Sequence, residues 1–268
     1  MNKIDTVLLK AALSLNQMII EMSNKKLELK RITKIASLLS LSGYINIANF
    51  NSVKNKCINT QNIDGGWISI VDTMWNTFFL SRFCQNKLLN NITRGINFIE
   101  QNEGRSHLWG RSKRDFERIP VSGTMLWLHH SLATNERLKA LENLWISEEN
   151  SLTYKASYTL LAFKSNFYSP CNKRLIDSTI EWLLSNQRED GSFAPWKTHP
   201  VQSDTYCTSL GLLGLMSYKE LVPYKNIKLC ANWLINTQLS TGIWPYHEID
   251  DGTGWALFAL SEFKKNYE

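Results

Sequence analysis

The sequence has few of the residues that divide a chain into separate units. Of its 268 residues, 6 are proline and 13 are glycine. No Pro-, Gly- or Ser-rich stretch that could serve as a linker interrupts the chain. A chain of this length can bury one full-sized core, so we expect a single domain spanning residues 1–268.

Cysteine is also scarce, and its placement argues against a disulfide scaffold. The five cysteines are odd in number and widely spaced, and no Cys-x-x-Cys pair occurs. This pattern is typical of reduced thiols, so we expect a cytoplasmic protein.

Long apolar runs are absent as well. The apolar N-terminal stretch from Thr6 to Ile20 contains Lys10 and Gln17 and is too short to cross a bilayer, so we expect neither a transmembrane segment nor a signal peptide. The formal net charge of +6 allows an anionic substrate or partner. No segment resembles a nucleic-acid-binding module, and the Lys-rich segment 21–33 is interpreted as a solvated helix face.

A short pattern recurs along the chain, in which a glutamine is followed by a glycine-containing turn and an aromatic residue. Its copies begin at Gln61, Gln101, Gln187 and Gln238. They lie about 40 to 50 residues apart, except for a longer middle interval with room for a degenerate copy in the segment 145–164. This spacing is the size of one helical hairpin stacked on its neighbours. The sequence therefore predicts an array of such hairpins.

Each copy separates two helical patterns of different character. The segments that end at the glutamines, such as 88–99, carry one apolar stripe with helical period. The segments that follow the loops, such as 206–216, are apolar nearly all round, as expected for helices buried on all sides. We predict alternating outer and inner helices in about six pairs, the first of them supplied by residues 1–45. They would close into an all-α, two-layered helical barrel, an α/α toroid.

The repeated pattern resembles that of the terpenoid cyclase and protein prenyltransferase superfamily, squalene-hopene cyclase and its relatives above all. The segments 61–67 and 187–193 match the signature Gln…Asp-Gly-(Gly/Ser)-(Trp/Phe) fully, and 238–244 has Thr241 in place of Asp. The copy at Gln101 is degenerate. The resemblance covers roughly residues 55–268 and implies a toroid with a central apolar cavity.

An apolar cavity of this kind suits the aromatic content of the chain, which includes 10 tryptophans. Aromatic faces would stabilise a carbocation by roughly 0.5 to 2 kcal/mol each. The repeat places five tryptophans near cavity-facing ends: Trp67, Trp75, Trp127, Trp244 and Trp255.

The segment before the last inner helix resembles the Asp-x-Asp-Asp-Thr acid motif of class II terpene cyclases. Glu248 takes the first position, Asp250 and Asp251 form the pair, and Gly252 is inserted before the threonine. The resemblance implies that Asp250 protonates an alkene or epoxide, with Glu248, Asp251 and His247 in support. A dry pocket and neighbouring carboxylates both raise a carboxyl pKa, as such an acid requires.

The alternative for this segment is structural. Asp72 and Asp204 occupy the equivalent position in other repeats, where each is expected to cap the helix that follows. In this alternative Asp251 has the same role and only caps its helix.

A second candidate site is the loop 105–118, which is rich in cations. Their side chains could clamp a diphosphate or another anionic group, because guanidinium forks bind such groups in a bidentate manner. The alternative is a solvated loop whose cations pair with Asp115 and Glu117. The candidate binding residues are Arg105, Arg111, Lys113, Arg114 and Arg118.

Three functions follow from these motifs. The first is a class II-like isoprenoid cyclase without a cofactor, apart from Mg²⁺ that would accompany a diphosphate substrate; no Asp-Asp-x-x-Asp motif for metal-driven ionisation occurs. The second is a non-catalytic toroid that binds a lipid, peptide or protein partner. The weakest is a zinc enzyme like the prenyltransferases, with Asp204, Cys207 and His247 as ligands.

The resemblance also has a consequence for how many subunits the protein would need. Class II cyclases of the family generally build their cavity between two toroids, whereas this chain is expected to form one. An isoprenoid cyclase of this length would need a partner subunit, a homodimer interface or a smaller hydrophobic substrate.

Overall fold

The computed structural model describes residues 2–24, 28–44, 50–83, 88–148 and 151–268, and α-helices are the main regular elements in these ranges. A short 3-10 helix, η3, spans His130–Leu132. The α-helices are α1 (Lys3–Asn24), α2 (Leu29–Leu41), α3 (Asn51–Thr60), α4 (Ile70–Arg82), α5 (Leu89–Gln101), α6 (Ile119–Leu128), α7 (Asn135–Glu148), α8 (Thr153–Ser165), α9 (Leu175–Asn186), α10 (Thr205–Ser217), α11 (Tyr224–Thr237) and α12 (Ile249–Tyr267).

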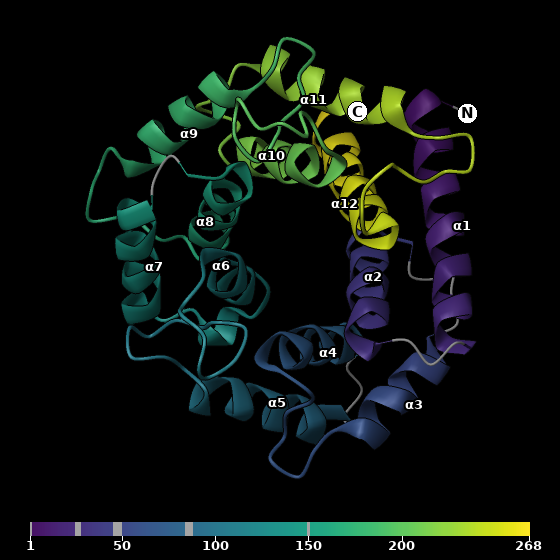
Figure 1. Ribbon diagram of the computed structural model, residues 1–268, viewed down its shortest axis with the longest axis vertical. Helices are drawn as coiled ribbons and strands as arrows, with labels where there is room; N and C mark the ends of the chain where they lie inside the picture. The colour runs from purple at the N-terminus through teal and green to yellow at the C-terminus, as the bar shows by residue number, and fades with distance from the viewer. Residues whose placement is uncertain (1, 25–27, 45–49, 84–87, 149–150) are drawn as a thin grey trace.

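The helices form two concentric layers (Figure 1). The even-numbered helices make an inner ring in which each packs on the next, and α12 packs on α2 to close it. The odd-numbered helices surround this ring, and α1 also packs on α12. The predicted two-layered helical barrel is therefore confirmed. The pair expected from residues 1–45 is α1 and α2, and the degenerate copy is α7 and α8.

Burial distinguishes the two layers as the apolar patterns predict. In the inner helix α10, Tyr206 is the one residue between Thr205 and Leu215 that is not buried. In the outer helix α5, by contrast, the buried residues are Gly95 and Ile99. An outer helix needs one apolar stripe, because its other face meets water.

The repeated glutamine joins neighbouring hairpins. Gln187 donates from Nε2 to the carbonyl of Gly191 in its own turn (3.0 Å) and to that of Asn226 in the next outer helix (2.9 Å). Gln238 donates in the same way, but its second acceptor is the carbonyl of Val7 in α1 (2.9 Å). The last copy of the repeat thus ties the end of the ring to its beginning.

The turn after the glutamine depends on glycine. Gly191 has a φ of +89°, which favours glycine over other residues. A Cβ at this position would also collide with the backbone of Leu229 on the next outer helix. Asp190 completes the turn by accepting the backbone N–H of Ser192 at 3.0 Å.

Candidate active site

Two adjoining cavities open at the end of the ring where the inner helices begin. The smaller, of about 510 Å³, is bordered by the first turns of α2, α4 and α6. The larger, of about 830 Å³, is bordered by the first turns of α10 and α12 and the loops before them. Both are lined by Arg111, Pro120 and Tyr206. We call them the small and the large mouth cavity.

The middle of the ring holds a cluster of aromatic side chains around Trp255. This indole is fully buried, and Trp127 stacks on it with ring centres 6.0 Å apart. Three further rings meet it edge to face at 6.0 to 6.3 Å: Trp75, Tyr158 and Tyr206. Trp75 lines the small mouth cavity, whereas Trp127 lines a separate hollow at the opposite end of the ring.

Trp67 and Trp244, which we expected near cavity-facing ends, border neither mouth cavity. Trp67 donates from Nε1 to the carbonyl of Cys57 at 3.2 Å, and Trp244 donates to that of Leu234 at 2.8 Å. Both acceptors lie on the outer helix of the same repeat. The repeat aromatic is buried between the layers because it joins the two helices of its hairpin.

Asp250 lies in the first turn of α12 and is buried. Arg31 of α2 binds it in a bidentate manner, with 3.1 Å between Nε and Oδ2 and a second bond from Nη2 to Oδ1. A guanidinium fork stabilises the carboxylate, which is the opposite of what an alkene-protonating acid requires. Asp250 borders neither mouth cavity.

The other members of the predicted acid motif surround the cavities. Asp251 lines the large mouth cavity and forms an ion pair with Lys34 of α2, with 2.5 Å between Oδ1 and Nζ. His247 lines the same cavity, and Glu248 lines the small one. The motif therefore lies at and beside the mouth of the ring, and each of its two aspartates forms an ion pair with a cation of α2.

Asp204 is a carboxyl group in a different environment. It caps α10, where its Oδ1 accepts the backbone N–H of Cys207 at 2.6 Å, and it lines the large mouth cavity. Burial raises the pKa of this carboxyl, a shift that the hydrogen bonds from the cap and the nearby His247 oppose. Among the described residues, no lysine or arginine forms an ion pair with it.

The predicted zinc ligands share a cavity but do not form a metal site. Asp204, Cys207 and His247 all line the large mouth cavity. In the described part of the chain, however, no three His, Cys, Asp or Glu side chains are arranged to hold a metal ion. Burial also raises the pKa of the Cys207 thiol well above its usual value, which disfavours the thiolate that binds zinc. The zinc alternative is not supported.

The cations of the loop 105–118 divide into three groups. Arg118 binds Asp115 with both ends of its guanidinium, at 2.7 and 2.9 Å, and this pairing holds the pKa of Asp115 well below its usual range. Arg111 lines both mouth cavities. Arg105, Lys113 and Arg114 are exposed and border neither.

Sequence reasoning missed the cations of α2: it interpreted Lys30 and Arg31 as part of a solvated face and did not consider Lys34. Lys30 and Lys34 line the small mouth cavity, and Arg31 reaches Asp250. The sequence did contain a signal for the two lysines. Positions four apart, such as 30 and 34, share one face of a helix, and these lysines alternate with the apolar residues Ile32 and Ile35.

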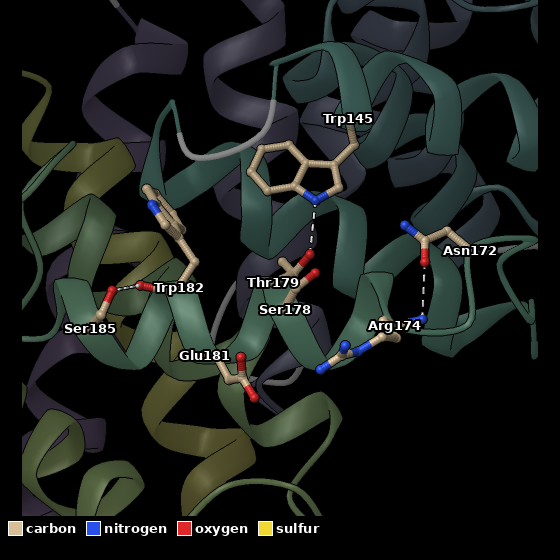
Figure 2. A pocket seen from close by; sticks show the side chains of 8 residues that line it. All are labelled: Trp145, Asn172, Arg174, Ser178, Thr179, Glu181, Trp182 and Ser185. Atoms are coloured by element: carbon tan, nitrogen blue, oxygen red, sulfur yellow. Dashed lines mark hydrogen bonds between the residues drawn. The ribbon is translucent and has the colours of Figure 1, made fainter.

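A further hollow, of about 660 Å³, lies on the outer surface between α7 and α9 (Figure 2). Several of its polar groups are hydrogen-bonded within the fold. Trp145 donates to Thr179 Oγ1 at 2.9 Å, and Asn172 accepts the backbone N–H of Arg174 at 3.1 Å. None of the predicted site residues lines it.

The amino-acid sequence matches no protein-family model and no curated protein. Solved structures do match. The type II terpene cyclase MstE from Scytonema, in its apo form, has a TM-score of 0.71 and 12% identity, with 99% of each chain covered. A variant of MstE in complex with geranylgeranyl dihydroxybenzoate, described as the substrate, has a TM-score of 0.72 and 13% identity over 97% of each chain.

Two further matches agree with these. An MstE variant in complex with merosterolic acid A, described as the product, has a TM-score of 0.68 and 14% identity, covering 98% of this chain and 97% of that one. A protein from Actinoplanes has a TM-score of 0.67 and 12% identity, covering 87% and 89%. In the described residues, every helix is too short or too polar to span a membrane. The closed double ring of helices and these matches together give the chain a terpenoid cyclase-like fold.

Proposed function

We propose that this protein is a class II-like isoprenoid cyclase, in which a carboxylic acid in the large mouth cavity protonates an alkene. The observation that carries the proposal is Asp204. This carboxyl lies at the wall of a cavity rich in apolar surface, burial raises its pKa, and no described cation pairs with it. Burial and the lack of a paired lysine or arginine both favour the protonated form of a carboxyl group.

The size of the chain is compatible with this activity. MstE, a type II terpene cyclase that binds geranylgeranyl dihydroxybenzoate, is aligned over 97% of its length with 97% of this chain. One ring of this extent is therefore enough for that protein to hold an isoprenoid substrate. We infer that the present chain likewise takes an isoprenoid with a polar head group, without needing a second toroid.

Asp204 can act as the acid without giving up its role at the start of α10. Its Oδ1 accepts the backbone bond from Cys207, so we place the acidic proton on Oδ2. Transfer of this proton to one alkene carbon leaves a carbocation at the other, which the next double bond of the isoprenoid attacks to form a ring. A final loss of a proton from carbon to water or a base restores a neutral hydrocarbon skeleton.

Aromatic rings in the large cavity are placed to stabilise the carbocation. Tyr154, Tyr206 and Tyr246 line it, and Tyr206 stacks on Tyr246 with ring centres 5.7 Å apart. Lys34 instead places its ammonium 5.5 Å from the ring centre of Trp75 and 5.8 Å from that of Trp255. A cation already lies against these two indoles, so we place the carbocation on the tyrosine side.

The test compares carboxyl variants in incubations with geranylgeranyl dihydroxybenzoate and geranylgeranyl diphosphate, with products identified by mass spectrometry. Asp204→Asn keeps an oxygen for the cap and loses the acid, so we expect turnover to fall at least about 100-fold with the fold retained. Asp72→Asn is the control, since Asp72 lies in the first turn of the inner helix α4, which Ser69 caps, and lines neither mouth cavity. It should retain activity.

Asp250→Asn distinguishes the sequence-based prediction from the present one. If Asp250 is the acid, this variant loses turnover while Asp204→Asn retains it, and our assignment is wrong. If the wild-type protein forms no cyclic product yet binds these substrates saturably, the non-catalytic toroid is the correct alternative.

A further inference from the structure

We propose that the small mouth cavity is a binding site for an anionic head group, formed by Lys30 and Lys34 of α2 together with Arg111. The inference rests on the proposed function in one respect, namely that the hydrocarbon part of the same ligand lies in the large cavity. It assigns a ligand chemistry, a phosphate or carboxylate on an isoprenoid chain, to residues outside the predicted acid motif.

The lining of the small cavity carries more positive than negative charge. Its three cations face one lining carboxylate, Glu248. The remaining acids nearby are already engaged: Asp251 pairs with Lys34, and the exposed Glu28 lies 3.6 Å from Lys30. Of the three cations, Arg111 has no ion-pair partner among the described residues, and Lys30 has only the exposed Glu28, so an anion that enters this cavity can bind these two side chains in competition with little else.

Lys34 is the fixed member of the group. Its ammonium is held between Asp251 and the faces of Trp75 and Trp255, and its side chain is 20% exposed. Because a side chain so restrained loses little freedom on binding, it presents its charge to the cavity at a low entropic cost.

Arg111 is the member that reaches both cavities. Its backbone N–H donates to Asp115 at 3.1 Å, which fixes the loop at this point. Within the described residues no carboxylate forms an ion pair with its guanidinium, so the fork is available for the bidentate contacts that phosphate and carboxylate groups accept. Arg118, in the same loop, is instead bound to Asp115.

The two cavities together match an amphiphile. They adjoin at Arg111, Pro120 and Tyr206, which line both. A head group on the cations of the small cavity would therefore leave its hydrocarbon chain to enter the large cavity, towards Asp204. This arrangement selects isoprenoids that carry a charged head over free isoprenoid alcohols or hydrocarbons.

Binding to the intact protein, followed by quenching of tryptophan fluorescence, tests this site without relying on turnover. The probes are geranylgeranyl diphosphate, geranylgeranyl dihydroxybenzoate and the uncharged alcohol geranylgeraniol. We expect at least one acidic probe to bind more than about tenfold more tightly than the alcohol, and the acid that does so identifies the head group. Equal affinity for all three would overturn the proposal.

The variants Lys30→Gln and Arg111→Gln locate the site. Each should weaken binding of the favoured acidic probe about five- to tenfold and leave the alcohol unaffected. Lys113→Gln is the matched control, because it removes one positive charge from the same loop outside the cavities. If Lys113→Gln weakens binding equally, the effect comes from overall charge and the site is not the small cavity. Loss of product formation without loss of this discrimination would refute the proposed reaction but not the head-group site.

Discussion

At the scale of single residues, partners decide what a carboxyl can do. Asp250 and Asp204 both lie at the start of an inner helix, yet a guanidinium binds the first and a backbone N–H binds the second. A bound cation favours the carboxylate, whereas burial without one favours the neutral acid. The same residue type near the start of two inner helices therefore takes on different chemistry.

Another buried titratable group, His129, makes the stability depend on pH. Its ring is 6% exposed and its Nε2 lies 3.1 Å from the carbonyl of Met74, and burial lowers its pKa to about 4. In an unfolded chain the pKa is about 6.5. Between these values the unfolded state binds a proton that the folded state does not, so the free energy of unfolding falls as the pH decreases.

We expect this one group to lower the stability by an amount on the order of 3 kcal/mol between pH 6.5 and 4. His129→Gln keeps an uncharged N–H donor for Met74 and does not titrate. Urea unfolding of both proteins across this pH range should give a shallower decline for the variant. Parallel curves would show that His129 does not titrate in this way.

At the scale of helices, the repeated glutamine links each hairpin to the next outer helix. Gln238→Ala removes the bonds to Gly242 and Val7, both at 2.9 Å. Because two backbone carbonyls lose their donor, we expect a loss of about 1 to 3 kcal/mol in the free energy of unfolding. Amide hydrogen exchange should also become faster in α1, which this bond attaches to the end of the ring.

Gln187→Ala is the comparison for this prediction. It removes the corresponding bonds to Gly191 and Asn226, but these lie between α9 and α11. A similar loss of stability is expected, without a change of exchange in α1. If both variants alter α1 equally, the glutamine bonds act on the ring as a whole and not helix by helix.

At the scale of the whole molecule, the inner ring is packed around Trp255. The indole is fully buried and contacts rings from α4, α6, α8 and α10. Trp255→Ala would leave a large cavity where these helices meet, and we expect it to cost about 3 to 5 kcal/mol in the free energy of unfolding. Denaturant unfolding measures this directly.

Two further variants calibrate that result. In the described residues the Trp255 N–H has no hydrogen-bond partner, so Trp255→Phe loses no bond and should cost less than the alanine variant. Trp196 is 40% exposed, and Trp196→Ala should change stability by no more than about 0.5 kcal/mol. Equal losses for Trp255→Ala and Trp196→Ala would mean that the central cluster does not hold the ring together.

The sequence by itself determined the layers and the turns. Inner and outer helices differ in their apolar pattern, and turns such as Gln187 to Phe193 carry the glutamine, glycine and aromatic that end one helix and lead into the next. These signals are local, since each depends on residues within a few turns of the chain. They also placed the motif from His247 to Thr253 at the mouth of the ring.

Only the tertiary structure decided which charges meet there. Arg31 and Asp250 are 219 residues apart in sequence and become partners because ring closure brings α2 beside α12. No pattern within either segment records that contact. The ion pairs of Asp250 and Asp251, and the lack of a lysine or arginine ion pair at Asp204 among the described residues, therefore depend on how distant helices pack against one another.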